Sequence, residues 1–357
     1  MEKDALNTLL RLVVERGASD LFLTTGASPQ IKVNGVVQAL PLPSLRPGQV
    51  QELAYSAMDA DTIAAFERTL ECNIAYAPTG IGRFRINVYR QRREVGLVAR
   101  LVHSRIPDFT QLGLPDIVAD LALLPRGLVL IIGSAGSGKT TTLASMVDYR
   151  ARSQSGHILT VEDPIEYLFN HAASTVDQRE VGVDTLSFSD ALRNAMRQAP
   201  DMIMIGEIRD QETMQHAMTY AETGHLCVST LHASNASQAI KRILNFFPES
   251  AHRQLLVDLS INLQAVVAQR LLPGVDDTRA LATEVMVQSA HVAALIQRGA
   301  IEDLRQSLEK AAVAGTHTFD QSLFDLVQRG RISPETALAY ADSRTDLGLR
   351  MRLHAAH

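Results

Sequence analysis

The feature that most constrains the fold is a glycine-rich octapeptide set between an apolar run and a helical stretch. The run Leu128–Ile132 predicts a buried strand, and the residues from Thr141 onward are compatible with a helix. Between them the chain reads Gly133-Ser134-Ala135-Gly136-Ser137-Gly138-Lys139-Thr140. This is the strict P-loop pattern in the strand–loop–helix setting that the motif requires. It predicts a phosphate-binding loop in a parallel α/β sheet.

The residue types of the octapeptide explain how it would bind a nucleoside triphosphate. Glycines let successive backbone N–H groups turn inward toward phosphate oxygens, and the N-terminal end of the following helix adds positive potential. Lys139 would bridge the β- and γ-phosphates, and the Thr140 hydroxyl would ligate Mg²⁺. We therefore expect all eight residues to form the nucleotide site, with ATP and Mg²⁺ as cofactors.

The hydrophobic pattern divides the chain into parts of different character. Residues 1–102 combine a helical stretch at 6–16 with short alternating runs, which favours an α+β domain. The alternating runs are Asp20–Thr25, Gln30–Val33, Val36–Leu40, Gly82–Arg90 and Val95–Val102, with Asn34-Gly35 as a hairpin turn and a helical stretch at Val50–Glu67. Residues 103–115 contain two prolines and a glycine with little periodicity, and we interpret them as a linker.

A different pattern begins at residue 116. Short apolar runs alternate with segments long enough for crossover helices, which predicts a doubly wound parallel sheet over residues 116–275. The predicted strands are Leu128–Ile132, His157–Val161, Met202–Ile205 and Leu226–Thr230. Residues 276–357 are expected to be mostly helical, with one strand at Ala280–Val287 and helices at Phe319–Gln328 and Pro334–Ala341.

The composition excludes several classes of protein. With 46% hydrophobic and 20% charged residues, the 357-residue chain is typical of a packed globular protein. Its two cysteines, Cys72 and Cys227, cannot form a disulfide framework or a four-ligand zinc site. No apolar stretch reaches the ~18 residues of a membrane span and no signal peptide is evident, so we expect a cytoplasmic protein. A net charge of −5 argues against a broad basic surface for nucleic acid.

Acidic residues follow two of the predicted strands. The segment Asp201–Glu207 is an apolar strand that ends in an acid, the form of a Walker B element, and Glu207 could orient Mg²⁺ through water. The strand His157–Val161 is followed by Glu162, Asp163 and Glu166. One of these three carboxylates could polarise the attacking water as a general base, and the spacing does not select which.

Two histidines, His225 and His232, flank the predicted strand Leu226–Thr230. They are seven residues apart, so they cannot share a face of an ideal strand, and a metal pair is therefore unfavourable. A histidine at a strand edge can hydrogen-bond a γ-phosphate and report its presence. The alternative, a packed histidine with a structural hydrogen bond, fits the pattern equally well.

Several segments, taken with the P-loop, resemble the secretion and type IV pilus ATPase superfamily. They are Glu162–Glu166, the sequence Gly206-Glu207-Ile208-Arg209-Asp210, the sequence Ala221-Glu222-Thr223-Gly224-His225-Leu226, and Thr318–Asp325. The chain is more closely similar to the type IV pilus retraction ATPases, the family of PilT and PilU, essentially from end to end. The sequences Gln198-Ala199-Pro200-Asp201, Asn245–Pro248 and Ala341–Arg350 make it most like the PilU branch.

This resemblance implies a fold and a set of roles. The fold class is α/β, with a RecA-like P-loop ATPase core, an α+β PAS-like N-terminal domain and a helical C-terminal region. The resemblance assigns the general base to Glu166, the Walker B role to Glu207 and the histidine-box roles to His225 and His232. It also implies that arginines of the N-terminal domain reach a nucleotide site, and Arg83, Arg85 and Arg100 match the positions. For these three, ordinary charges on a strand surface are an equal alternative.

The implied function is that of an ATP-hydrolysing hexameric motor that drives pilus retraction. Contacts to the γ-phosphate would draw the N-terminal domain onto the core, hydrolysis would release it, and residues 103–115 would be the hinge. The implied partners are copies of the same chain in a homohexamer, a paralogous retraction ATPase and an inner-membrane pilus platform protein, without nucleic acid. The implied location is the cytoplasmic side of the inner membrane at the pilus base.

Three alternatives remain open. His291–Arg298 is a degenerate form of a signature of the retraction ATPases, which favours an ATP-binding accessory subunit beside a principal motor. A secretion or pilus extension ATPase usually carries a four-cysteine zinc motif, which this chain lacks. A nucleic-acid translocase would require salt-dependent DNA binding, for which the net charge gives no support.

Overall fold

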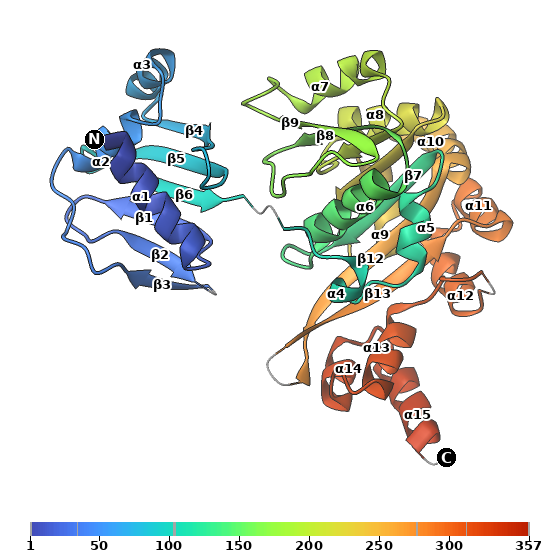
Figure 1. Ribbon diagram of the computed structural model, residues 1–357. Helices are drawn as coiled ribbons and strands as arrows, with labels where there is room; N and C mark the ends of the chain where they lie inside the picture. The colour runs from blue at the N-terminus through green and yellow to red at the C-terminus, as the bar shows by residue number, and fades with distance from the viewer. Residues whose placement is uncertain (1, 34, 103–104, 276–277, 312, 356–357) are drawn as a thin grey trace. The chain divides into compact units, whose positions relative to one another are not determined.

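The chain divides into two compact units. The computed structural model describes residues 2–33, 35–102, 105–275, 278–311 and 313–355 (Figure 1). One unit contains the residues up to Arg105 together with Glu166–Leu168, and the other contains Ile106–Ile165 and the residues from Phe169 onward. The division falls inside the expected linker. Asn34 of the expected hairpin turn and His103 and Ser104 of the expected linker lie outside the described residues.

In its described residues, the N-terminal unit is an antiparallel sheet of six strands with three helices. The strands are β1 (Asp20–Thr24), β2 (Gln30–Val33), β3 (Val36–Ala39), β4 (Glu71–Tyr76), β5 (Phe84–Gln91) and β6 (Glu94–Leu101), in the spatial order β3-β2-β1-β6-β5-β4. The helices are α1 (Glu2–Glu15), α2 (Gln49–Tyr55) and α3 (Ala60–Thr69). Alternation along β5 buries Phe84, Ile86 and Val88 on one face, where the apolar side of α1 completes the core.

The C-terminal unit is built on a seven-stranded sheet. Its strands are β7 (Gly127–Gly133), β8 (Gly156–Glu162), β9 (Ser174–Glu180), β10 (Met202–Ile205), β11 (Leu226–Leu231), β12 (Leu263–Pro273) and β13 (Arg279–Val287), in the order β13-β12-β7-β11-β10-β8-β9. Every neighbouring pair is parallel except β12 and β13. The expected parallel core is confirmed, and β13 extends the same sheet past residue 275.

Helices cover both faces of this sheet (Figure 1). The helices of this unit are α4 (Phe109–Leu112), α5 (Ile117–Ala122), α6 (Lys139–Ser153), α7 (Phe188–Ala195), α8 (Gln211–Glu222), α9 (Ala236–Asn245), α10 (Glu249–Asn262), α11 (Ala290–Gln297), α12 (Leu304–Glu309), α13 (Phe319–Gln328), α14 (Pro334–Tyr340) and α15 (Arg344–Ala355), with 3-10 turns at Met196–Gln198 and Ile301–Asp303. Helices α14 and α15 pack on α13 rather than on the sheet (Figure 1). Strand β7 is buried on both sides, with Val129 and Ile131 in the core beneath α5 and α6 and Leu130 in the core beneath α8 and α9. A continuously apolar strand is what a doubly covered parallel sheet requires.

The sheet order brings the sequence motifs to one edge. Strands β7, β11, β10 and β8 are consecutive neighbours and run in the same direction, so their carboxyl ends lie together. The P-loop follows β7, His232 follows β11, Glu207 follows β10, and Asp163 follows β8. Ligands of open α/β sheets bind at this edge.

Candidate nucleotide site

The P-loop curls around the ammonium group of Lys139. Lys139 Nζ donates hydrogen bonds to the carbonyl oxygens of Gly133 at 3.0 Å and Ser134 at 2.8 Å. The Ser137 hydroxyl donates to the Ser134 carbonyl at 2.9 Å. Lys139 is the first residue of α6, and Thr140 beside it is exposed. The loop therefore places a cation and a free hydroxyl at the N-terminal end of a helix, where anions bind favourably.

All three glycines of the loop have a positive φ, and the first and the last show the structural reason most clearly. Gly133 has a φ of +154°, and a Cβ there would lie 2.6 Å from the carbonyl oxygen of Gln269 and 2.4 Å from Ser137 Oγ. Gly138 caps α6 with a φ of +88°, in the left-handed region that side chains disfavour. The motif thus needs a glycine at Gly133 because the backbone of β12 approaches closely there, and a glycine at Gly138 because the chain enters α6 in a left-handed conformation.

The environment of Lys139 favours the binding of an anion next to its ammonium group. Only 8% of the residue is exposed. Burial lowers the pKa of its ammonium group, and the negative charge of Glu207 acts in the opposite direction. A buried cation of this kind gains most from a phosphate, which supplies charge and hydrogen-bond acceptors together.

Glu207 is held between two side chains at the end of β10. His232 Nε2 lies 3.2 Å from Glu207 Oε1, and Arg209 Nε donates to Glu207 Oε2 at 2.8 Å. Arg209 also lies 3.6 Å from Asp163, between Nη1 and Oδ2. Its hydrogen bond to Glu207 raises the pKa of the guanidinium group. The acids after β8 and β10 and the histidine after β11 therefore form one polar cluster.

The three carboxylates after β8 are in different environments. Glu162 is buried, and its Oε1 accepts hydrogen bonds from Thr160 Oγ1 at 2.7 Å and Gln178 Nε2 at 3.1 Å. Asp163 is exposed and paired with Arg209. Glu166 is grouped with the N-terminal unit rather than with the P-loop. The buried hydrogen bonds give Glu162 a structural role, and the assignment of the general base to Glu166 stays a prediction.

The two histidines flanking β11 are not brought together. His225 precedes the strand and His232 follows it, so they lie at opposite edges of the sheet. His225 Nδ1 is 3.1 Å from Thr223 Oγ1, and its carbonyl accepts a hydrogen bond from the N–H of Gly127 at 3.0 Å. Within one chain, then, only His232 joins the cluster around Glu207. A catalytic role for His225 stays a prediction.

The expected arginines share a part of the N-terminal sheet. Arg85 and Arg100 are direct cross-strand partners on β5 and β6, and Arg83 directly precedes β5. Arg100 Nε donates to the buried Asp20 at 2.8 Å, and this hydrogen bond raises the pKa of Arg100. The ion pair gives Arg100 a function within its own unit, and the nucleotide role of all three residues stays a prediction.

Sequence reasoning missed two residues of this site. Arg209 lies within a segment quoted for the family resemblance, but only its contacts to Glu207 and Asp163 reveal its role. Gln269 is opposite Gly133 in the sheet and donates to Thr142 Oγ1 of α6 at 2.7 Å. Gln269 lies inside β12, opposite the last residue of β7, and this place could have been found only if β12 had been predicted.

Comparisons with known proteins agree with this geometry. A model of the family described as type II/IV secretion system protein matches residues 3–337. The chain belongs to this family. It is 48% identical over 346 residues to the type IV pilus ATPase PilU of Pseudomonas aeruginosa, covering 97% of this chain and 91% of the relative. It is 39% identical to the type IV pilus retraction ATPase PilT of the same organism, covering 93% of this chain and 96% of the relative.

A solved structure gives the same result in three dimensions. The crystal structure of the pilus retraction motor PilT with bound ADP superposes with a TM-score of 0.89 and is 40% identical, covering 95% of this chain and 98% of that one. The expected resemblance to the PilT and PilU family, the α/β fold class and the class of P-loop ATPase are thereby confirmed. No helix in the described part of the chain combines the length and the apolar character that a membrane crossing needs.

Proposed function

We propose that the chain is an ATP-hydrolysing motor subunit of type IV pilus retraction, of the PilU kind. The observation that carries this proposal is the pairing of a complete P-loop with a Glu207 held by His232 and Arg209 at the same sheet edge. Similarity to PilU over nearly the whole chain supports the cellular role. The motor acts as a homohexamer at the cytoplasmic side of the inner membrane, beside a paralogous ATPase and on the pilus platform protein.

The donor set near the P-loop suits Mg²⁺. Among the described residues no group of three or more His, Cys, Asp or Glu side chains is placed to hold a metal ion alone. Mg²⁺ in phosphate-transfer sites needs only one or two carboxylates besides phosphate oxygens and water. Thr140 offers an exposed hydroxyl and Glu207 a carboxylate, both hard oxygen ligands. When bound, Mg²⁺ neutralises charge on the phosphates.

Each residue of the site has a separate role in hydrolysis. The backbone amides of Gly133–Thr140 and the Lys139 ammonium bind and orient the triphosphate. Glu207 would orient the water bound to Mg²⁺, and His232 holds the Glu207 carboxylate in position. Glu166 serves as general base, and Arg83, Arg85 and Arg100 stabilise charge on the transferred phosphoryl group. His225, at the opposite end of β11 from His232, has the second histidine role that the family resemblance implies.

The division of the chain into two units suits a motor. The boundary lies between Arg105 and Ile106, within the expected hinge at residues 103–115. Ordering of one unit by a γ-phosphate and its release on hydrolysis is an established way of converting chemical energy into rigid-body motion. We propose that this division is the mechanical joint.

The second candidate function is an ATP-binding accessory subunit. The observation that favours it is the sequence His291–Arg298, in α11 and its C-cap, which departs from the retraction signature. ATP turnover by the purified chain, with Lys139→Ala and Glu207→Ala as controls, separates the two. A motor hydrolyses ATP well above both variants, whereas an accessory subunit does not.

The cellular experiment compares a gene deletion with the Lys139→Ala variant at the native locus. A motor predicts that in both strains pili assemble and retraction is impaired to the same degree. Retraction that is impaired only by the deletion would show that the chain's presence matters and its hydrolysis does not. Loss of pilus assembly would instead indicate an extension ATPase.

A further inference from the structure

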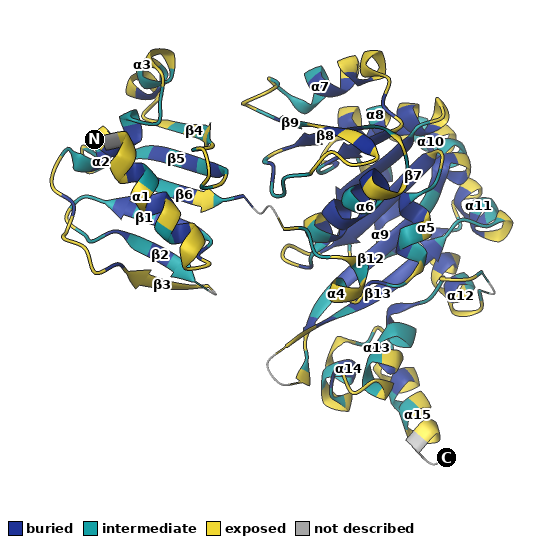
Figure 2. Cartoon of the chain, viewed as in Figure 1, coloured by how far each residue is buried: buried dark blue, intermediate teal, exposed yellow. Residues whose placement is uncertain are grey.

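The three last helices enclose an apolar groove that the nucleotide site does not use. The cavity has a volume of about 850 Å³ and lies between α13, α14 and α15. Its apolar lining includes Val327, Pro334, Leu338, Gly348 and Met351. Figure 2 shows that much of this helical part of the chain is exposed or half-buried. A groove of this size is within the range of ligand-binding cavities.

A glycine keeps the groove open. Gly348 stands in the interior of α15, where a glycine costs about 1 kcal/mol of helix stability relative to alanine. A Cβ at this position would meet Leu338 Cδ2 at 3.5 Å, which is ordinary van der Waals contact. Packing therefore does not forbid a side chain here. The absence of one leaves room beside Leu338 and Met351.

The charge of the groove has one sign. Its charged or ionisable lining residues are Arg344, Arg352 and His354, and no carboxylate is among the described lining residues. The nearby Asp346 accepts a hydrogen bond from the Ser343 hydroxyl instead. Both arginines are exposed and belong to the same helix as Gly348. An occupant that complements this groove carries apolar side chains and negative charge.

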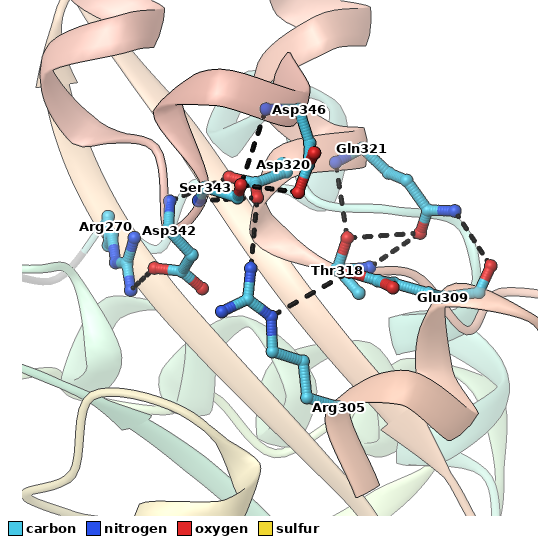
Figure 3. Close-up of polar contacts among 9 residues, drawn as sticks. All are labelled: Arg270, Arg305, Glu309, Thr318, Asp320, Gln321, Asp342, Ser343 and Asp346. Atoms are coloured by element: carbon cyan, nitrogen blue, oxygen red, sulfur yellow. Dashed lines mark hydrogen bonds and ion pairs between the residues drawn. The ribbon is translucent and has the colours of Figure 1, made fainter. Parts of the chain in front are cut away.

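A polar cluster fixes the shape of the groove in advance (Figure 3). The Asp320 carboxylate accepts the backbone N–H groups of Asp342 at 2.8 Å and Ser343 at 2.9 Å, in the turn that joins α14 to α15. Arg305 lies 3.3 Å from the same carboxylate, and Arg270 pairs with Asp342 at 2.7 Å. The helices are thus tied to β12 and α12 before anything binds, which lowers the entropy lost on binding.

The length of the groove suits a helix. The lining residues of α15 run from Arg344 to His354, about 15 Å at 1.5 Å per residue. This is two to three turns of a partner helix, and an amphipathic helix that lays its apolar face in a groove is a common mode of recognition. We propose that this groove docks an amphipathic helix of another protein, with its apolar face against Gly348 and its carboxylates paired with Arg344 and Arg352.

The test uses the intact chain and a displayed library of 16-residue amphipathic peptides. Leucine is fixed at positions i, i+4 and i+7, and the remaining positions vary among Glu, Lys, Ala and Gln. Peptides selected on the chain are then measured by fluorescence anisotropy. The informative variant is Gly348→Met, which fills the groove. Gly348→Ala is the matched control, because it adds only a Cβ and improves helix propensity.

The proposal predicts that selected peptides are enriched in Glu and bind saturably. Gly348→Met and Arg344→Glu/Arg352→Glu should each weaken binding by about tenfold or more, while Gly348→Ala leaves it within about twofold. Thermal unfolding and nucleotide binding report that each variant is folded. Three results would overturn the proposal: no enrichment, enrichment without charge preference, or binding that survives Gly348→Met. Binding of anionic phospholipid vesicles in place of peptides would assign the surface to a membrane instead.

Discussion

His232 Nε2 lies 3.2 Å from Glu207 Oε1, across the carboxyl ends of two neighbouring parallel strands. The contact joins a residue after β11 to one after β10, 25 positions earlier in the chain. The other oxygen of Glu207 accepts from Arg209. The negative charge of Glu207 acts on the ammonium group of Lys139. Partners on both sides therefore fix the orientation of the carboxylate that Lys139 senses.

Removal of the histidine side of this pair should slow hydrolysis without weakening nucleotide binding. Because His232 and Glu207 are partly exposed, the contact is worth about 1 kcal/mol, and His232→Ala should lower kcat about fivefold. His232→Gln is the control, since its amide can donate to the same oxygen. Steady-state ATPase assays with parallel nucleotide titrations measure both quantities. An unchanged kcat for His232→Ala would exclude a positioning role.

Arg209 should not be replaceable by lysine. Its guanidinium fork contacts Glu207 and Asp163 together, and a point charge cannot reproduce both contacts in one geometry. Arg209→Lys and Arg209→Ala should both lower kcat by about fivefold to tenfold, with Kd for nucleotide little changed. Near-native kcat for Arg209→Lys would mean that only the charge matters.

The first glycine of the P-loop should be the least tolerant of substitution. In Gly133→Ala the new Cβ would collide with the backbone carbonyl of Gln269, which cannot move without disturbing β12. We expect a loss of about 1–3 kcal/mol in stability and weaker nucleotide binding. Gly136→Ala meets no atom within 4 Å and strains only a φ of +76°, so its effect should be nearer 1 kcal/mol. Urea unfolding compares the two, and equal costs would contradict the steric explanation.

Glu284 of β13 should make stability depend on pH. Burial raises the pKa of this carboxyl to about 7, and it accepts the backbone N–H of Ala236 at 2.9 Å. Asp342 raises the pKa further, whereas Arg270 and Arg305 lower it. Because the folded chain holds this proton more tightly than the unfolded chain, the group's contribution is fully present below about pH 4.5 and is lost as the pH rises toward 7.

Glu284→Gln removes this titration and keeps an acceptor for Ala236. Its stability relative to the native chain should therefore rise by about 2–3 kcal/mol between pH 5 and pH 8. Thermal unfolding of both proteins across this range measures the difference. A difference that stays constant with pH would show that Glu284 titrates normally.

The fold could be predicted where the sequence pattern is local. Strands β2 and β10 and helix α13 have the expected bounds. Strands β7 and β8 are longer than expected by one residue at each end, and β11 is longer by one residue at its carboxyl end. The helical stretch Val50–Glu67 is instead two helices, because Asp59 caps a new helix by accepting the N–H of Thr62. Residues 109–112 of the expected linker form α4 with a capping box.

Strands without a local signal were missed. Strand β9 has the polar sequence STVDQRE and lies at the edge of the sheet, so it lacks an apolar run. Strand β12 follows α10 directly at Leu263, with no glycine or proline to separate them. Strand β4 is an edge strand with exposed positions.

In the candidate site, too, the sequence predicted only what a local pattern specifies. The places of the P-loop and Glu207 at the carboxyl edge of the sheet were predictable, because each comes within two residues of the end of a strand with a clear apolar run. The separation of His225 from His232 follows from the length of β11, since a six-residue strand puts its two flanking residues at opposite edges. The contacts of Arg209 and Gln269 depend on the order of strands in the sheet, which no local pattern contains.

The most direct test of the central claim is nucleotide binding by the intact chain. Fluorescently labelled ATP with Mg²⁺ should bind saturably to the native protein. Lys139→Ala, which removes a charged donor worth about 1.5–3 kcal/mol, should weaken binding by roughly tenfold to a hundredfold. Equal binding by the native chain and the folded Lys139→Ala variant, or no saturable binding by either, would contradict the account.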